Sequence, residues 1–144
     1  MVEAALGMTL TPQELAGVEM HEKTGGIDLL VDDEPTAIAL AKQYLAYLSD
    51  QPSGQPHHRA ERIADLVPES GPYDIYPVIE ALVDNDSIFE LRPQFAPSVV
   101  TALARIDGKV VGVVANNPNF DSGVITESAA TKIGRFVELC DTYE

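Results

Sequence analysis

One short stretch constrains the fold of this 144-residue chain most, an Asp-Gly pair set between two runs of β-forming residues. Asp107-Gly108 separates residues 98–106 from residues 109–115, and a two-residue Asp-Gly loop is typical of a type I′ turn between antiparallel strands. We therefore predict a β-hairpin. Its second strand is apolar at almost every position, so we expect both faces of that strand to be covered. Gly112 inside the strand indicates that another side chain or backbone approaches closely there.

A long helix is predicted after the hairpin, which gives a β-β-α order. Thr126 is a suitable N-cap, Glu127 favours the first turn, and the helical pattern continues to about residue 142. Cys140 is the only cysteine in the sequence, so an internal disulfide is excluded and a buried structural thiol is the expected role. The helix face expected to pack on the sheet comprises Ala129, Ile133, Phe136 and Cys140.

The first third of the sequence predicts two helices and a short strand. Thr11 and Pro12 favour a short helix that stops at Gly17, and the apolar run at 27–31 is expected to be a strand. Acidic residues then introduce a second helix over 36–48. Its apolar face is so wide that we expect most of it to be buried against something large. That face comprises Ile38, Ala41, Leu45 and Leu48, with Ala37, Leu40, Tyr44 and Tyr47 beside them.

A boundary is predicted in the middle of the chain. Residues 49–62 are rich in Pro, Gly, Ser and Gln, which is typical of a linker, and the predicted linker extends over 49–72. Residues 73–83 then predict a helix, and residues 88–91 a short strand. The apolar side expected for this helix contains Ile75, Val78, Ile79 and Leu82.

The composition argues against several classes of function. The net charge is −14 and the nine Lys and Arg residues are scattered, which argues against nucleic-acid binding because phosphate contacts need clustered cations. No apolar run approaches the roughly 20 residues of a membrane span. The N-terminus lacks the basic region of a signal peptide, so we expect a cytoplasmic protein. His21, His57 and His58 lack further ligands at suitable spacing, so no metal site is predicted.

Several strings in the sequence resemble one family in order and spacing. They are ALGMTLTPQELAGVEMHEKTGGIDLLVDDE and YLAYL before the linker, and YDIYPVIEALVDNDSIFEL, ALARIDGKVVGVVANNP and KIGRFVELCDTYE after it. Together they resemble the carboxyltransferase (β) subunit of biotin-dependent acyl-CoA carboxylases, the propionyl-CoA carboxylase group. The resemblance implies an α/β fold, bordering on α+β, with partial crotonase-like ββα units. It also implies that 1–48 ends the first of the family's two halves, that 49–72 links them, and that 73–144 begins the second.

The resemblance implies transfer of a carboxyl group from carboxybiotin to an acyl-CoA of the propionyl-CoA or acetyl-CoA class. The family's two glycine-rich oxyanion loops, which stabilise the enolate-like transition state, match no segment of this chain. Gly25-Gly26 falls in a different family segment. We therefore expect an internal fragment that is inactive on its own and contains no catalytic residue.

The resemblance also implies partners. Biotin would arrive on a carrier domain of another chain, so the implied partners are biotin carboxylase, a biotin carrier subunit and further copies of the chain, with an acyl-CoA as substrate. A fragment would leave the apolar face of residues 36–48 and one side of the hairpin sheet uncovered, which favours self-association or a swapped assembly. Two alternatives stay open: a decarboxylase-branch subunit that acts on a CoA thioester, and a non-catalytic assembly or binding module derived from the family.

Few residues are candidates for a site. Asn116 and Asn117 stand at the end of the second hairpin strand, on the half that handles biotin in the family, and are candidates for the biotin pocket. The alternative is that these asparagines only satisfy the turn that follows. Lys23 is a candidate for contact with a CoA phosphate. Arg105 is expected to be a partly buried charge that pairs with an acid such as Glu90 or Asp107.

Overall fold

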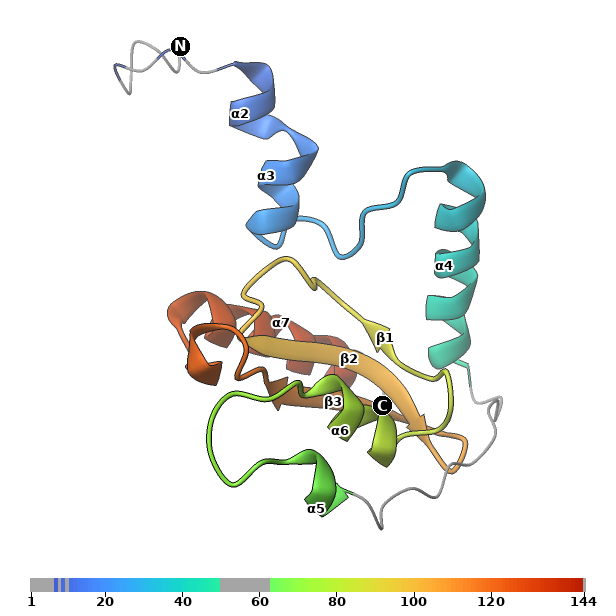
Figure 1. Cartoon of the computed structure of the whole chain (residues 1–144). Helices are drawn as coiled ribbons and strands as arrows, with labels where there is room; N and C mark the ends of the chain where they lie inside the picture. The colour runs from blue at the N-terminus through green and yellow to red at the C-terminus, as the bar shows by residue number, and fades with distance from the viewer. Residues whose placement is uncertain (1–6, 8, 10, 50–62, 144) are drawn as a thin grey trace.

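The structure of the chain is a computed structural model that describes residues 7, 9, 11–49 and 63–143. The described elements are α2 (Pro12–Ala16), α3 (Val18–Lys23), α4 (Glu34–Tyr47), α5 (Ile63–Leu66), α6 (Tyr76–Leu82), β1 (Phe89–Glu90), β2 (Val99–Ile106), β3 (Lys109–Asn116), the 3₁₀ turn η2 (Asp121–Gly123) and α7 (Glu127–Thr142). Figure 1 shows the sheet at the centre, α7 along it, α4 at the periphery, and α2 and α3 extending away.

The predicted hairpin is confirmed. β2 and β3 pair antiparallel with Ile106 opposite Lys109, and both turn residues adopt positive φ angles, 50° at Asp107 and 77° at Gly108, as a type I′ turn requires. A buried carboxylate holds this turn from outside the hairpin. Asp84 Oδ1 accepts a hydrogen bond from the Asp107 N–H at 3.1 Å, and Asp84 Oδ2 accepts one from the Gly108 N–H at 2.7 Å.

The expectation that both faces of the second strand are covered is wrong. The sheet order is β1-β2-β3, so β2 is the central strand and β3 is an edge strand of the described sheet. β2 is buried at every position except Ile106, whereas no residue of β3 is fully buried. Val110 and Val114 remain 38% and 46% exposed. Apolar composition is therefore a poor guide here, because the position of a strand within the sheet decides its burial.

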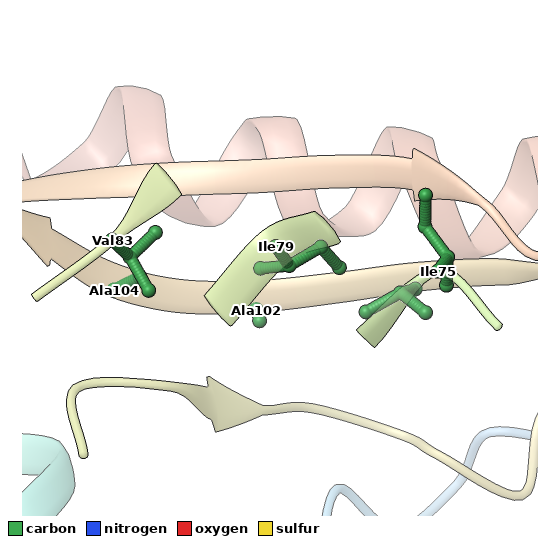
Figure 2. Packing of buried hydrophobic residues seen from close by; sticks show 6 residues of the cluster. Ile75, Ile79, Val83, Ala102 and Ala104 are labelled. Carbon is green, nitrogen blue, oxygen red and sulfur yellow. The ribbon is translucent and has the colours of Figure 1, made fainter. Parts of the chain in front are cut away.

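Alternation along β2 divides the core into two clusters, one on each face of the sheet. Val100, Ala102 and Ala104 pack against Ile75, Ile79 and Val83 of the α6 region. Figure 2 shows Ile79 and Val83 lying over Ala102 and Ala104, with α7 behind the sheet. The helix is shorter than predicted, since it begins at Tyr76, and its Leu82 is exposed rather than buried.

α7 covers the opposite face of the sheet, as predicted, and begins at the predicted N-cap. The Thr126 side chain accepts a hydrogen bond from the Ala129 N–H at 3.2 Å. Of the predicted face, Ala129 and Phe136 are buried, while Ile133 and Cys140 are half-buried. The second cluster lies under this helix and consists of Tyr47, Phe89, Leu91, Leu103 and Phe136.

The close approach predicted at Gly112 is also confirmed. A Cβ atom added to Gly112 would lie 2.8 Å from Cys140 Sγ and 3.2 Å from the Phe136 ring. Cys140 is half-buried, and burial raises the pKa of its thiol. The structure thus gives Cys140 the packing role expected from the sequence, although part of it remains accessible.

The predictions for the first third of the chain have mixed outcomes. α2 begins as predicted, with reciprocal hydrogen bonds between Thr11 and Glu14 that form a capping box. α2 also ends as predicted, with Gly17 as its C-cap, but a further helix, α3, begins directly after Gly17 and was not predicted. The strand predicted at 27–31 is wrong. No strand of the described sheet pairs with this segment. One backbone hydrogen bond among the described residues joins it to the β1 region, from the Arg92 N–H to Asp28 O at 2.9 Å.

The prediction that the wide apolar face of α4 is mostly buried is wrong within the described chain. Only Tyr47 is fully buried, while Ile38 is 48% and Leu45 is 60% exposed. The helix packs through the side that carries Leu40, Tyr44 and Tyr47, and these side chains join the cluster beneath α7. The predicted linker contains one short helix, α5, while residues 50–62, with His57 and His58, lie outside the described residues.

Candidate functional site

The strand end predicted as a site is a tightly bonded turn. Asn117 is buried, its N–H donates to Ser98 O at 2.8 Å, and its Oδ1 accepts from the Asn119 N–H at 3.3 Å. The Asn116 side chain donates from Nδ2 to Gly123 O. Both asparagines therefore stabilise the chain reversal after β3, which is the alternative role considered for them. Asn116 is nevertheless exposed, and no described residue donates a hydrogen bond to its side-chain oxygen.

The turn that follows contains local backbone strain. Asp121 and Ser122 adopt left-handed φ angles of 46° and 53°, and Gly123 follows at 70°. Residues other than glycine adopt positive φ angles only at a cost in conformational free energy, and residues in such conformations cluster at functional sites. A hollow of about 570 Å³ lies against this turn, lined by Gly71, Pro72, Pro118, Asn119, Asp121 and Ser122. The turn after the strand is therefore accessible from one side, although neither Asn116 nor Asn117 lines this hollow.

A buried polar cluster lies close to the same strand end, and it was not predicted from the sequence. Lys132 of α7 is fully buried, and its ammonium donates to Val99 O at 2.6 Å, at the start of β2. Val99 pairs with Asn116 in the sheet, so Lys132 holds the strand end from the α7 side. Burial lowers the pKa of Lys132 to about 8, an effect that the nearby Glu90 partly opposes. A lysine within a helix that is otherwise amphipathic offers no sequence signal of such burial.

Glu90 and Tyr76 complete this cluster. The Tyr76 hydroxyl donates to Glu90 Oε2 at 2.8 Å. Burial raises the pKa of Glu90, while the hydrogen bond from Tyr76 and the charge of Lys132 lower it. Burial also raises the pKa of Tyr76, and the hydrogen bond to Glu90 adds to that rise. The cluster fixes α7 and α6 to the sheet. Lys132 has no exposed surface and is closed to a substrate, whereas Tyr76 and Glu90 are half-buried.

Arg105 is buried, but its predicted acidic partners are wrong. Its guanidinium donates from Nη1 to Gly108 O at 2.9 Å and from Nη2 to Ala46 O at 2.7 Å. Its Cζ also lies 5.3 Å from the centroid of the Tyr47 ring. Glu90 instead bonds to Tyr76. Arg105 therefore joins the end of α4 to the hairpin turn through backbone carbonyls.

A mainly apolar groove lies elsewhere. It measures about 800 Å³ and runs between the segment before α4, α4 itself, β1 and α7. Arg92 lines it, forms an ion pair with Asp28 at 2.7 Å, and keeps a buried Nε without a hydrogen-bond partner among the described residues. Arg135 also lines the groove and donates to Gly25 O at 3.0 Å. The groove thus lies where the predicted parts 1–48 and 73–144 meet.

Lys23, the predicted phosphate contact, is exposed at the end of α3 and lines neither the groove nor the strand-end hollow. The structure therefore does not bring Lys23 together with Asn116 and Asn117. Over residues 11–49 and 63–143, no three His, Cys, Asp or Glu side chains gather where they could hold a metal ion. None of the described helices is both long enough and apolar enough to cross a membrane.

Comparison with known proteins gives a consistent result over the whole chain. Residues 1–144 match the carboxyl transferase domain family. The chain is 35% identical to the uncharacterized carboxylase YngE of Bacillus subtilis and 32% identical to the carboxyltransferase subunit of propionyl-CoA carboxylase of Haloferax mediterranei, in each case over 99% of this chain. It is 30% identical to the alpha subunit of methylmalonyl-CoA decarboxylase of Veillonella parvula, again over 99% of this chain. The chain spans about 30% of the length of these curated relatives.

The fold gives the same answer. The chain superposes on the crystal structure of transcarboxylase 12S, described as a hexamer assembly with methylmalonyl-coenzyme A and methylmalonic acid bound, with a TM-score of 0.86 and 31% sequence identity. The match covers 99% of this chain and 29% of that one. The sequence match and the fold together show that this mixed α/β chain belongs to the crotonase-like carboxyltransferase family of biotin-dependent acyl-CoA carboxylases.

Proposed function

We propose that these residues form part of a carboxyltransferase subunit that moves a carboxyl group from carboxybiotin to an acyl-CoA of the propionyl-CoA or acetyl-CoA class. The observation that carries this proposal is the match along all 144 residues to carboxyltransferases, combined with a span of only about 30% of their length. In this proposal residues 1–48 form the end of one crotonase-like half, and residues 73–144 form the beginning of the other. Residues 49–72 connect the two halves.

The chain alone is proposed to be inactive. Carboxyl transfer to the α-carbon of a thioester develops negative charge on the thioester oxygen, which needs free N–H donors directed at it. Gly25-Gly26 is the one adjacent glycine pair in the sequence. Its N–H groups are already used, since Gly25 donates to Glu22 O at 3.3 Å and Gly26 donates to His21 O at 2.7 Å. This supports a role for that pair in ending α3 and leaves the oxyanion donors to other parts of the subunit.

The strand end at β3 is the proposed place of contact with biotin. Biotin presents two ureido N–H donors and one carbonyl acceptor. The exposed Asn116 has a side-chain oxygen that is not engaged by the described residues, so it fits a ureido donor. Asn117 is buried in the turn and would act by holding the turn in shape. Lys23 stays a proposed contact for a CoA phosphate, supported only by its exposure and charge.

The decarboxylase branch is a second candidate function. It is favoured by the 30% identity to the alpha subunit of methylmalonyl-CoA decarboxylase, which nearly equals the identity to the carboxylase subunit. Both reactions handle a carboxyl group next to a CoA thioester, so a shared scaffold suits either. The match to the biotin-dependent family also supports the proposed partners, which are a biotin carboxylase or biotin carrier chain and further copies of the subunit. The cytoplasm is the proposed location. A non-catalytic module derived from the family is the remaining alternative.

A segment exchange tests the proposal. The matching segment of transcarboxylase 12S is replaced by these 144 residues, and transfer of the carboxyl group from methylmalonyl-CoA to free biotin is measured. We expect the chimera to transfer carboxyl groups and the 144-residue chain alone to show no turnover. A chimera carrying Phe136→Asp, which disrupts the buried core, serves as the inactive control.

Three results would count against the proposal. Turnover by the chain alone would mean that it contains its own oxyanion donors. A chimera that folds and forms the hexamer but transfers nothing would instead favour a non-catalytic module. Release of carbon dioxide without transfer to biotin would favour the decarboxylase branch.

A further inference from the structure

The buried ammonium of Lys132 takes the place of a strand partner at the start of β2. Successive carbonyl groups of a strand point to opposite sides. Just before β2, Ser98 O accepts from the Asn117 N–H at 2.8 Å on the β3 side, so Val99 O points to the β1 side. In the described sheet β1 pairs with β2 only farther along that strand. Lys132 instead donates to Val99 O, at 2.6 Å.

The segment between β3 and this lysine forms a loop that both leaves and rejoins the sheet at the same place. It leaves the sheet at Asn116, which lies opposite Val99. The chain then passes through η2 and the N-cap of α7, and it returns to Val99 through the Lys132 side chain. Residues 117–131 are therefore held at both ends by the first residue of β2.

This loop contains backbone that depends on such support. Asp121 and Ser122 adopt left-handed φ angles of 46° and 53°, and conformations of this kind persist where surrounding contacts determine them. The Asn116 side chain bonds across the loop, from Nδ2 to Gly123 O. The direction of its side-chain oxygen therefore depends on the shape of the loop, and a bond that fixes the loop also fixes this oxygen.

Stability by itself is a poor reason for a lysine at this position. An ammonium loses its hydration when it is buried, and an apolar side chain of similar size often stabilises a core as well or better. Lys132 has no exposed surface, and its hydrogen bond goes to a backbone carbonyl, while the nearby Glu90 accepts its bond from Tyr76. This arrangement favours a role in fixing one geometry of the backbone.

We propose that Lys132 is a positioning residue for the contact with biotin, because its bond to Val99 O closes the loop and holds the Asn116 side-chain oxygen in place. The inference rests on the proposed function, in which Asn116 contacts biotin. Its own basis is a fully buried contact, which further parts of a longer subunit can cover but cannot expose. Lys132 does not touch a substrate and acts through Val99 and the loop.

Hydrogen exchange in the full 144-residue chain tests whether Lys132 holds the loop. Lys132→Met keeps the size of the side chain and removes the donor, so exchange of the Asn117 N–H should accelerate about tenfold, as expected for loss of one charged hydrogen bond. Exchange of the Asp107 N–H, in the hairpin turn, should change less than about twofold. Tyr47→Phe is the matched control, since it also removes one buried donor from a backbone carbonyl, Ser87 O, at 2.6 Å. It should leave exchange at Asn117 unchanged.

The chimera with transcarboxylase 12S tests the effect on biotin. Lys132→Met should raise the KM for free biotin about tenfold and leave the KM for methylmalonyl-CoA within about twofold of the original. A general loss of folded enzyme would instead lower kcat and leave both KM values unchanged. Tyr47→Phe should shift neither KM. Lys132→Gln keeps an uncharged donor on a side chain one bond shorter, so it should give a smaller rise, and it serves if the methionine variant does not fold.

Two results would overturn the inference. Equal acceleration of exchange at Asn117 and Asp107 would mean that Lys132 only stabilises the whole fold. A chimera that transfers carboxyl groups with the same KM for biotin before and after Lys132→Met would mean that the loop does not position the biotin contact. Absence of transfer in every chimera contradicts the proposed function instead, and exchange at Asn117 still decides whether Lys132 holds the loop.

Discussion

Lys132 has the setting least like that of an ordinary lysine. It is fully buried, with its ammonium donating to Val99 O and the charge of Glu90 nearby. Taking an ammonium out of water is unfavourable, so the folded state releases this proton more readily than the unfolded chain does. The stability of the fold should therefore depend on pH through this one side chain.

The first prediction is a rise in stability with pH. The pKa of Lys132 is about 8 in the folded chain against 10.5 for a free lysine, so between these values the unfolded state binds more protons. The free energy of unfolding should then increase with pH in this window, by at most about 1.4 kcal/mol per pH unit. Below about pH 8 the contribution of Lys132 should not change with pH. Urea unfolding at intervals from pH 7 to 10 measures it.

The control for this prediction removes the titrating group. Burial raises the pKa of the Cys140 thiol, so above about pH 9 this group lowers the free energy of unfolding as pH rises. The experiment therefore compares two variants that both carry Cys140→Ala, one with Lys132 and one with Lys132→Met. In that background Lys132→Met should lose the rise with pH. Equal slopes for the two chains would contradict a buried, proton-releasing Lys132.

The second prediction concerns Gly112, where α7 approaches β3 closely. Gly112→Ala places a methyl group 2.8 Å from Cys140 Sγ, and overpacking of this kind should lower the free energy of unfolding by about 1–3 kcal/mol. Adding Cys140→Ala removes the sulfur and should recover part of the loss, which a double-mutant cycle of thermal unfolding measures.

Gly134 on α7 is the matched control for Gly112. A Cβ atom there meets nothing within 4 Å, so Gly134→Ala should stabilise the helix by up to about 1 kcal/mol. If both substitutions destabilise equally, the close packing of Gly112 against α7 is not what limits the size of that residue.

At the scale of elements, the hairpin depends on a residue outside it. The Asp84 carboxylate accepts hydrogen bonds from both turn N–H groups, and the Asp84 N–H donates to Arg105 O at 2.7 Å. Ser87 adds to this contact, because its hydroxyl accepts from the Arg105 N–H at 3.1 Å. The segment after α6 thus acts as a cap for the turn.

The third prediction follows from that cap. Asp84→Asn keeps the shape but presents an NH₂ group to one of the two turn N–H donors, so it should cost about 1–3 kcal/mol in the free energy of unfolding. The nearby Asp86 is exposed and has a φ of 54°, a conformation that asparagine tolerates, so Asp86→Asn should be nearly neutral. Chemical denaturation of the two variants compares them, and equal effects would contradict the cap.

Element prediction from sequence succeeded where the signal was local. The Asp-Gly turn, the helix start at Thr11 and Pro12, and the Thr126 N-cap each use residues within a few positions of one another. The strand at 27–31 failed because a strand needs a partner, and apolar composition alone does not provide one. The burial of β3 failed for a related reason, since only the order of the sheet makes β2 central and β3 an edge.

At the scale of the whole molecule, Arg105 connects the two parts on either side of the predicted linker. Its guanidinium reaches Ala46 O at the end of α4 and Gly108 O in the hairpin turn, while the Tyr47 hydroxyl donates to Ser87 O at 2.6 Å. A planar group with several donors can satisfy both carbonyls at once. Removing it would take one hydrogen bond from each carbonyl, and among the described residues Ala46 O would keep only the bond from the Ser49 hydroxyl at 3.1 Å.

The fourth prediction is therefore that Arg105→Lys loosens α4. A single ammonium cannot hold both carbonyls and stack on Tyr47, so we expect a loss of about 1–3 kcal/mol in the free energy of unfolding. The substitution should accelerate hydrogen exchange of the amides in α4 more than that of the amides in α7. Lys109→Arg, an exposed change on β3, should leave exchange in α4 unchanged. Uniform acceleration in both helices would contradict a local role for Arg105.

The sequence by itself determined the features that short-range chemistry controls: the hairpin and its turn, the starts of α2 and α7, the amphipathic face of α7, and the strings that place the chain in its family. The tertiary structure alone decided which strand is central, that Lys132 and Arg105 are buried among backbone carbonyls, and that the described residues leave Ile38 and Leu45 of α4 exposed. Asn116 and Asn117 show where prediction from the sequence ends and tertiary structure is needed. Their turn could be read from the sequence, but whether an asparagine amide is free for a ligand depends on groups brought close by folding, such as Gly123 O and the Asn119 N–H. Burial and hydrogen-bond partners are properties of long-range contacts, and no local pattern encodes them.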